Sequence, residues 1–334
     1  MNLADPGGPV ALEAEQVALP TTVIGGWLGA GKTTLVNHLL RTAAGRRIAV
    51  LVNDFGEVSI DADLIEGADG DVLSLAGGCM CCSWGEDLFG TLARVRARRP
   101  APDVLLVETS GVALPASVAR LLRLAPGLAV EATVVLADAE SVRGHAADPY
   151  VGDLVRQQLA EADLLLLTKA DLVGADQANA MAHWLGQQVP GVRVVVAPQG
   201  QVAAGVVLGW GTFQTPGADV CVPGGADAQG ESVNPGLVKG DADAPWKPSG
   251  WRRLLSGAES RFESGSQLHC GPVDVEALGQ ALCAEGSRVV RAKGILTGLD
   301  GQPVALHVVG HRFTLSPPPA RPLQIGRLTW IALR

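Results

Sequence analysis

Short aliphatic and β-branched runs alternate along the first two thirds of the chain with segments of helix length, such as residues 34–44 and 86–98. These runs are apolar throughout rather than alternately polar, which is typical of strands that are buried on both faces of a parallel sheet. The expected strands are residues 22–24, 48–53, 72–75, 104–108, 132–138, 164–168 and 192–196. The pattern predicts an α/β fold, with a mostly parallel sheet covered by helices on both faces.

The pattern changes after residue 210. Residues 211–261 are dense in Gly, Pro, Ser and Asp and show no period, which indicates a linker or a long surface excursion. Periodic segments then return in the order strand, helix, strand, strand, at residues 267–270, 273–284, 289–296 and 304–309. We therefore expect a loose tail (1–20), a first domain (21–210), a linker (211–261) and a smaller α+β domain (262–334).

The charge and composition of the chain exclude several classes of binding partner and location. The net charge of -8 gives no basic field for nucleic acid or an anionic membrane. No apolar run approaches the ~18 residues of a membrane helix. Residues 1–20 contain no Lys or Arg, so they do not resemble a secretory signal. The six cysteines are clustered rather than spaced as a disulfide framework, so a cytoplasmic protein with reduced thiols is expected.

A phosphate-binding loop is the most specific motif. Residues 26–33 match G-x-x-x-x-G-K-[ST] between an apolar strand and a helix. Backbone N–H groups of such a loop surround the β-phosphate, and the helix N-terminus adds favourable charge. Lys32 is expected to reach the β- and γ-phosphates, and the Thr33 hydroxyl to bind Mg²⁺. The expected nucleotide-binding residues are Gly26, Gly29, Ala30, Gly31, Lys32, Thr33 and Thr34. The alternative, a glycine-rich turn that matches by chance, is disfavoured by this context.

An acidic residue follows a buried strand later in the chain. Glu108 ends the run 104–108, and Gly111 comes three residues later. The carboxyl ends of parallel strands border the ligand crevice, so Glu108 is expected to hold the Mg²⁺ shell or to position water. Gly111 is expected to donate its N–H to the γ-phosphate. The catalytic candidates are thus Lys32, Glu108 and Gly111, against the alternative that Glu108 is an ordinary strand-end acid.

The residues expected to select the nucleotide base are 168–171, which read Thr-Lys-Ala-Asp and follow the apolar run 164–167. The carboxylate of Asp171 can accept hydrogen bonds from the N1–H and amino group of guanine, which adenine does not supply in that arrangement. Lys169 is expected to lay its stem over the base, and Thr168 completes the motif. GTP is therefore favoured over ATP, which argues against a small-molecule kinase.

Three cysteines lie between the phosphate loop and Glu108. Cys79, Cys81 and Cys82 follow two glycines. Thiolates at this spacing suit Zn²⁺ or Cu(I) and do not exclude Co²⁺. Three ligands leave one coordination position open, which suits a metal that is passed on. The alternative is a buried, inert group of cysteines.

Residues 53–57 follow the second expected strand and contain Asp54 and Glu57. In P-loop GTPases this region often responds to the γ-phosphate. Its carboxylates, Glu57 above all, are candidate ligands for the metal or for Mg²⁺. A plain polar loop is an equally good interpretation.

Together these motifs resemble the CobW-like branch of the P-loop metallochaperone GTPases, in the CobW/HypB/UreG family. The resemblance rests on residues 26–34, 53–61, 77–82, 108–111 and 168–171, and on the run Arg291-Ala292-Lys293-Gly294. It implies GTP hydrolysis, zinc or a similar ion at the three cysteines, and delivery of metal to a client protein that the C-terminal domain helps to recognise. Turnover is expected to be slow, because no arginine finger can be identified from the sequence. A nucleotide- or metal-dependent homodimer is also expected.

The chain departs from the family pattern at several points. Asp54 stands where relatives commonly have Glu, Thr168 replaces the more frequent Asn, and the linker lacks a His-rich run. A terminal helix is expected to be missing. The competing hypotheses are a cobalt or iron chaperone for cobalamin or nitrile hydratase maturation, and a GTPase assembly factor in which the cysteines only brace the fold.

Overall fold

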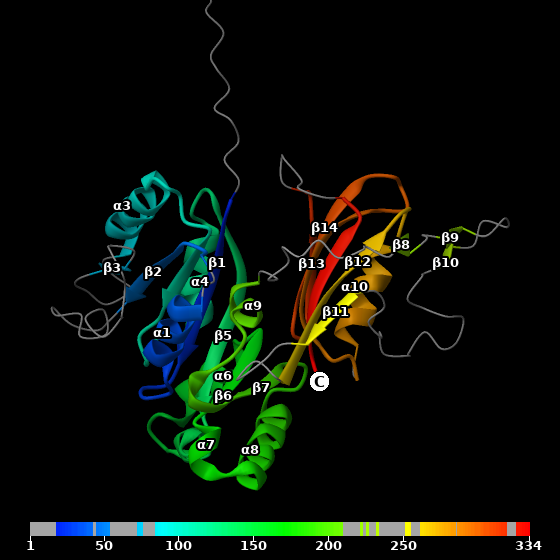
Figure 1. The fold of residues 1–334 in the computed structure, drawn as a ribbon. Helices are drawn as coiled ribbons and strands as arrows, with labels where there is room; N and C mark the ends of the chain where they lie inside the picture. The colour runs from blue at the N-terminus through cyan, green and yellow to red at the C-terminus, as the bar shows by residue number, and fades with distance from the viewer. Residues whose placement is uncertain are drawn as a thin grey trace, which may run out of the picture.

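The computed structural model describes residues 18–42, 45–53, 72–75, 84–209, 221–222, 225–226, 232–233, 251–254, 261–284, 286–318 and 325–334. Its first domain is built on a sheet of parallel strands in the order β3-β2-β4-β1-β5-β6-β7 (Figure 1). The strands are β1 (Leu19–Gly26), β2 (Ile48–Asn53), β3 (Val72–Leu75), β4 (Val104–Glu108), β5 (Leu128–Asp138), β6 (Leu164–Thr168) and β7 (Arg193–Ala197). Every strand predicted for this domain is confirmed, because strands buried on both faces must be continuously apolar.

Helices cover both faces of this sheet. They are α1 (Lys32–Thr42), α3 (Trp84–Ala97), α4 (Pro115–Arg123), α5 (Val142–Ala147), α6 (Gly152–Ala160), α7 (Ala170–Val173), α8 (Ala175–Gln188) and α9 (Ala204–Leu208), with a 3-10 turn η1 (Pro198–Gly200). Side chains alternate along β4: Leu106 packs in the core with α1, whereas Leu105 and Val107 pack with α3 and α4. The predicted α/β architecture, with helices on both faces, is confirmed.

The second domain is an antiparallel sheet in the order β11-β12-β16-β13-β14-β15, with one helix (Figure 1). Its elements are β11 (Trp251–Leu254), β12 (Phe262–His269), α10 (Val275–Cys283), β13 (Val289–Thr297), β14 (Pro303–Val309), β15 (Arg312–Ser316) and β16 (Arg327–Leu333). Helix α10 starts at Asp274, whose side chain accepts the N–H of Ala277 at 2.9 Å. The helix packs on one face of the sheet over a core that includes Trp330 and Leu306.

One expectation for this half of the chain was wrong. The order strand, helix, strand, strand misses β15 and β16, and β16 lies between β12 and β13 in the sheet. Residues 211–261, for which a linker or a long surface excursion was expected, contain the short strands β8 (Cys221–Val222), β9 (Gly225–Ala226), β10 (Ser232–Val233) and β11. Strands β8 and β11 both pair with β12, so this part of the chain contributes strands to the second sheet. The domain boundaries themselves stay a proposal.

The state of the thiols also differs from expectation. Cys270, just after β12, is disulfide-bonded, so the prediction that all six cysteines are reduced was wrong. Cys283, at the end of α10, is a free thiol, and burial raises its pKa to about 11. Among the described helices, none has both the length and the apolar character that crossing a bilayer requires.

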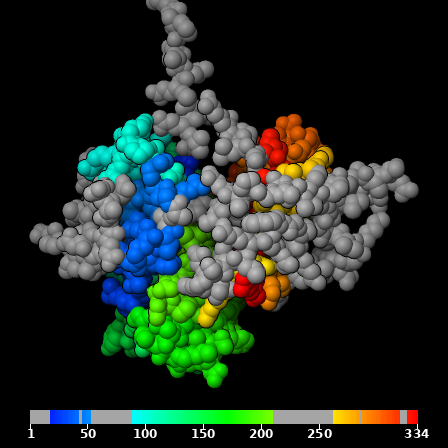
Figure 2. All heavy atoms as spheres, in the orientation of Figure 1, coloured from blue at the N-terminus to red at the C-terminus, as the bar shows by residue number. Residues whose placement is uncertain are grey.

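The two sheets share part of one core. Phe262, Val290 and Ile331 of the second domain belong to the same cluster of buried residues as Leu35 and Val206 of the first. The face of the second sheet opposite α10 therefore packs against the side of the first domain that carries α1 and α9. Figure 2 shows α1 and α3, in blue and cyan, at the surface of the first domain, with the α7–α8 region, in green, at its far end.

Candidate nucleotide site

The phosphate-binding loop joins β1 to α1 at the carboxyl edge of the parallel sheet. Gly29 and Gly31 have φ of +75° and +93°, in the left-handed region that favours glycine, and a Cβ at either position would meet nothing within 4 Å. Gly26 needs its small size, because a Cβ there would lie 2.6 Å from the carbonyl oxygen of Leu136. These glycines give the loop its curvature and leave its outer side open for a ligand.

Lys32 begins α1 and is almost fully buried. Its Nζ donates to the carbonyl oxygens of Gly26 at 3.1 Å and Trp27 at 3.3 Å, so the amine lies within the loop. The N–H of Ala30 donates to the Trp27 carbonyl at 3.1 Å and closes the turn. The loop thus holds a cation at its centre, where a phosphate group would require one.

Thr33 and Glu108 meet next to this lysine. The Thr33 hydroxyl donates to Glu108 Oε1 at 3.0 Å, and Glu108 is 1% exposed. Strand pairing explains the contact, because Glu108 lies opposite Ile24 where β4 runs beside β1. Thr34 is exposed in the first turn of α1. A hydroxyl and a carboxylate side by side form an oxygen-donor set of the kind that Mg²⁺ prefers.

Gly111 lies against the phosphate-binding loop. A Cβ at this position would be 2.8 Å from the backbone nitrogen of Leu28 and 2.5 Å from its Cδ2. Only glycine therefore allows the turn after β4 to approach the loop this closely. The three predicted catalytic residues, Lys32, Glu108 and Gly111, lie around one short stretch of loop.

The three residues of the predicted base motif, Thr168, Lys169 and Asp171, lie at the end of β6 and just after it. The Thr168 hydroxyl lies 2.8 Å from the Ala30 carbonyl oxygen and 3.2 Å from that of Ala137, so it ties β6 to the phosphate-binding loop. Lys169 has φ of 55° and forms an ion pair of 2.7 Å with Asp138. The motif and the loop are thus held together by hydrogen bonds between segments far apart in the sequence.

Asp171 connects the motif to a segment that the sequence did not reveal. Its Oδ1 accepts the backbone N–H of Gln199 at 2.7 Å, which fixes the carboxylate of α7 against η1. Gln199 has φ of 54°, rare for a residue that is not glycine. Because a carboxylate has about four acceptor positions, Asp171 keeps capacity for a guanine base.

Sequence reasoning missed Asp138, Gln199 and Gln158 as neighbours of the site. Asp138 is the last residue of β5, so the rule that ligands bind at the carboxyl ends of parallel strands provided a signal for it. Gln199 and Gln158 carry no comparable signal, because each acts through a contact with a residue far away in the sequence.

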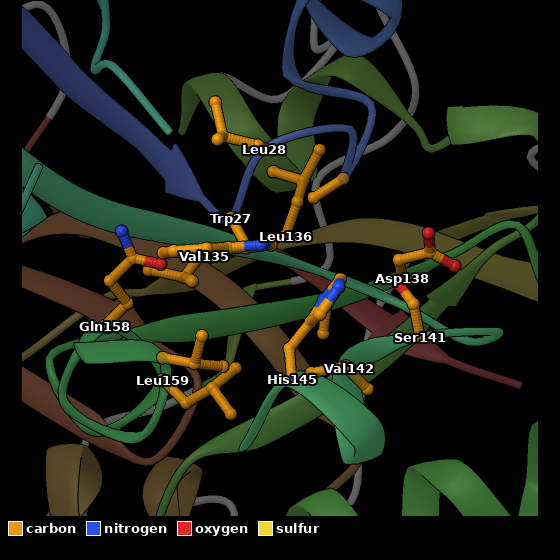
Figure 3. A pocket seen from close by; sticks show the side chains of 13 residues that line it. Trp27, Leu28, Val135, Leu136, Asp138, Ser141, Val142, His145, Gln158 and Leu159 are labelled. Atoms are coloured by element: carbon orange, nitrogen blue, oxygen red, sulfur yellow. The ribbon is translucent and has the colours of Figure 1, made fainter. Parts of the chain in front are cut away.

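A pocket lies beneath the phosphate-binding loop (Figure 3). Trp27 contacts the ring of His145 at a centroid distance of 5.9 Å, with the planes tilted by 51°. Gln158 and Asp138 lie at opposite ends of the pocket in this view. Most of the lining is aliphatic and comes from β5, α5 and α6, so the pocket supports the loop rather than offering a polar ligand site.

The predicted metal ligands Cys79, Cys81, Cys82 and Glu57, together with Asp54, lie outside the described residues. Within the residues that the structure does describe, no group of three His, Cys, Asp or Glu side chains is arranged to hold a metal ion. His38 is a packing residue: it is buried on α1, and its Nε2 lies 2.9 Å from the Val202 carbonyl oxygen.

The run Arg291-Ala292-Lys293-Gly294 lies at the junction of the two domains, away from the phosphate-binding loop. Lys293 Nζ is 2.6 Å from Glu131 Oε1, and an Arg291 nitrogen is 3.3 Å from Glu131 Oε2. Burial raises the pKa of Glu131, but the charges of Lys293 and Arg291 outweigh it, so this pKa lies below its ordinary value. Burial, with the charge of Lys293, lowers the pKa of the nearby His307 to about 4.

Known proteins resemble both domains. The family model for the CobW/HypB/UreG nucleotide-binding domain matches residues 20–196, and that for the cobalamin synthesis protein cobW C-terminal domain matches residues 262–327. The zinc chaperone CobW of Pseudomonas aeruginosa is 36% identical over 240 aligned positions, and the match covers 60% of this chain and 64% of that protein. The zinc-regulated GTPase metalloprotein activator 1 of Schizosaccharomyces pombe is 30% identical over 173 aligned positions, and the match covers 49% of this chain and 42% of that protein.

Among solved structures, the Zn(II)-bound YjiA GTPase of Escherichia coli is 21% identical, with 95% of each chain covered and a TM-score of 0.40. The chain thus spans less than two thirds of the length of the two relatives above. The first family model, however, covers more than half of this chain and contains the phosphate-binding loop, Glu108 and the base motif. The chain belongs to the CobW/HypB/UreG family of nucleotide-binding proteins.

Proposed function

We propose that this protein binds and hydrolyses GTP and that it acts as a metallochaperone, with zinc as its cargo. The observation that carries the nucleotide part is the contact between Thr33 and Glu108 at 3.0 Å, beside the Lys32 amine inside the phosphate-binding loop. A cation, a hydroxyl and a buried carboxylate meet at the carboxyl edge of the sheet, as phosphoryl transfer with a divalent ion requires. The names of relatives, which include GTPases, support the same activity.

Magnesium fits the residues present. Thr33 and Glu108 would hold it, Thr33 through its hydroxyl and Glu108 through the Mg²⁺ shell. When bound, the ion neutralises charge on the β- and γ-phosphates. Lys32 would bind the phosphates, and Gly111 would offer its N–H to the γ-phosphate. Glu108 would also orient the attacking water.

Guanine selection is proposed for Asp171, with Thr168 and Lys169. The carboxylate is already oriented by the Gln199 N–H, which reduces the cost of arranging it for a base. The Lys169–Asp138 ion pair holds the end of β6 next to the end of β5. The lysine stem is proposed to cover one face of the base.

The metal part of the proposal rests on Cys79, Cys81 and Cys82, with Glu57 as a further ligand. Their residue types and spacing suit Zn²⁺, and related proteins are named zinc chaperones. The motif lies in the chain between β3 and α3, and thus between the phosphate-binding loop and Glu108. Binding of metal and of GTP is proposed to be coupled by about 1–3 kcal/mol, equally in both directions. Delivery to a metal-dependent client protein is proposed from the names of the relatives.

A competitive metal titration tests this proposal. The purified chain is loaded with Zn²⁺ and Co²⁺ together, without nucleotide, with GDP and with GTP, while GTP turnover is followed. We expect zinc to be preferred, its affinity to change between GDP and GTP by roughly 5–150-fold, and Cys81→Ser to remove this change. Lys32→Ala is the nucleotide control, and it should lose GTP turnover while it keeps zinc.

Each of the other possible outcomes favours a different function for this protein. Preference for cobalt would favour the cobalt-chaperone alternative. Zinc affinity that is identical in all three nucleotide states would reject the coupled mechanism. If the GTP turnover rate does not depend on metal and Cys81→Ser lowers only the thermal stability, the protein is an assembly factor whose cysteines stabilise the fold.

A further inference from the structure

Helix α6 holds the turn that carries Gly111. The turn connects β4 to α4, and Gln158 of α6 is 1% exposed beside it. Gln158 Nε2 donates to the carbonyl oxygens of Gly111 at 3.0 Å and Ala113 at 2.8 Å. A side-chain amide carries two N–H donors, so this one group satisfies both carbonyls of the turn.

A second contact from α6 holds the far end of the same turn. Glu161, at the end of the helix, accepts the backbone N–H of Ala116 at 3.0 Å through Oε2. The turn also closes on itself, because the N–H of Ala113 donates to the Ser110 carbonyl at 3.1 Å. The backbone between Ser110 and Ala116 is therefore fixed at both ends from the side of α6.

The phosphate-binding loop lies on the other side of this turn. Leu28 contacts Gly111 so closely that a Cβ on the glycine would overlap the Leu28 side chain. In the described part of the chain, no acceptor pairs with the buried N–H of Gly111. Since buried backbone donors are nearly always paired, this N–H is a group that awaits a ligand.

Burial of the Gln158 amide costs free energy that only a role for its N–H donors would explain. Its Oε1 is buried and has no hydrogen-bond partner. An apolar side chain of similar volume, such as methionine, would avoid that cost and would fill the same space beside the aliphatic lining of the pocket (Figure 3). The amide is therefore better explained by what its nitrogen holds than by packing.

We propose that Gln158 is a positioning residue for GTP hydrolysis, which acts by holding the Gly111 N–H toward the γ-phosphate. In this reaction water adds to the γ-phosphorus, the bond to the β–γ bridging oxygen breaks, and GDP and phosphate leave; one proton of the water stays on the phosphate and the other passes to solvent. Gln158 touches neither reactant. It fixes the turn whose N–H meets charge that develops on the γ-phosphate oxygens. The inference rests on the proposed GTPase activity.

The test compares two neighbouring glutamines of α6. Gln158→Met removes the donors at nearly constant volume, and Gln157→Met makes the same change at an exposed position of the same helix. Gln157 donates only a long hydrogen bond of 3.4 Å to Glu161 Oε1, and the bond of Oε2 to the Ala116 N–H is left in place. Single-turnover GTP hydrolysis with Mg²⁺ is measured, together with the affinities for GDP and GTP. We expect Gln158→Met to lower the hydrolysis rate by roughly 10²-fold, with GDP affinity within about twofold of wild type. Gln157→Met should behave as wild type.

The outcomes separate this inference from the function on which it rests. A wild-type chain that binds GTP but never hydrolyses it would refute the proposed GTPase activity itself. An active wild type with a Gln158→Met variant of equal rate would overturn the positioning role, as would an equal loss of GDP and GTP binding. If Gln158→Met does not fold, Gln158→Asn provides the second test. Its stem is one methylene shorter, so the amide should no longer reach the carbonyl oxygens of Gly111 and Ala113, and a hydrolysis rate equal to wild type would again refute the proposal.

Discussion

Strand β5 carries a carboxylate near each end, and the two have different surroundings. Asp138 ends the strand beside the phosphate-binding loop, where it pairs with Lys169. The side chain of Glu131, near the start, is buried and pairs with the buried Arg291 and the partly exposed Lys293 of the second domain. At the nucleotide end, backbone and side-chain groups keep capacity for a ligand. At the domain junction, the charges largely satisfy one another. The comparison shows why a charged cluster by itself does not mark a ligand site.

Backbone irregularities direct the side chains at the junction. The pairing of β1 with β5 shifts where Thr21 faces Val130 and Thr22 faces Ala132, which leaves Glu131 as the extra residue. The pairing of β13 with β16 shifts in the same way just before Arg291. Such bulges turn side chains out of the regular alternation. Each partner of the buried ion pair therefore lies in or next to a bulge.

Removal of the charge of Glu131 should break the junction and leave the nucleotide end intact. Glu131→Gln leaves Arg291 buried without its carboxylate, so the free energy of unfolding should fall by about 3 kcal/mol. Urea unfolding of the full chain measures this. Glu276→Gln, an exposed glutamate on α10, is the matched control and should stay within about 0.5 kcal/mol of wild type.

The GDP affinity of the same two variants tests whether the domain junction and the nucleotide end are independent. It should be unchanged in both variants, because Glu131 does not contact the phosphate-binding loop. A Glu131→Gln protein as stable as wild type would show that the cluster contributes nothing to the junction.

His307 should make the junction sensitive to mild acid. Its pKa of about 4 in the folded chain lies below its ordinary value of 6.5, because of burial and then of Lys293. Between these values the unfolded chain binds the proton and the folded chain does not, so stability falls as the pH falls. From pH 7.5 to pH 5 this histidine should account for about 2 kcal/mol.

Urea unfolding at the two pH values isolates this effect. Glu131 has a lowered pKa and stays ionised at pH 5, so its contribution is lost only in stronger acid. His307→Asn should flatten the pH dependence between 5 and 7.5, whereas His183→Asn, an exposed histidine on α8, should not. An unchanged slope in His307→Asn would mean that the ring is protonated in the folded chain.

The sequence was enough for the parallel sheet and the phosphate-binding loop because both are local signals. Each buried strand is a continuous apolar run, and residues 26–33 are contiguous. Strand β12 shows where this fails. Only its last part was predicted, at residues 267–270, because the strand contains the buried polar residues Ser264, Gln267 and His269, which weaken the hydropathy signal. Strand β15 is largely exposed, and β16 joins the sheet only through pairing with distant strands.

The candidate site divides in the same way. Lys32, Glu108, Thr168 and Asp171 come from motifs that end strands or begin helices, so their convergence follows from the fold. Gln158 and Gln199 act by hydrogen bonds to Gly111 and Asp171, which are 47 and 28 residues away in the sequence. No spacing rule predicts such contacts, because they depend on how the loops pack. The pairing of Arg291 and Lys293 with Glu131 is of this second kind.

The most direct test of the central claim, that the carboxyl edge of the sheet is a guanine nucleotide site, is a titration of GDP, ADP and xanthosine diphosphate. Wild type should prefer GDP, and Asp171→Asn should lose roughly hundredfold in GDP affinity. The variant should gain affinity for xanthosine diphosphate, because the 2-carbonyl oxygen of xanthine can accept a hydrogen bond from the N–H of the new asparagine amide. The amide oxygen of the asparagine can still accept the Gln199 N–H. Equal affinity of wild type for GDP and ADP, with no change in Asp171→Asn, would contradict the account.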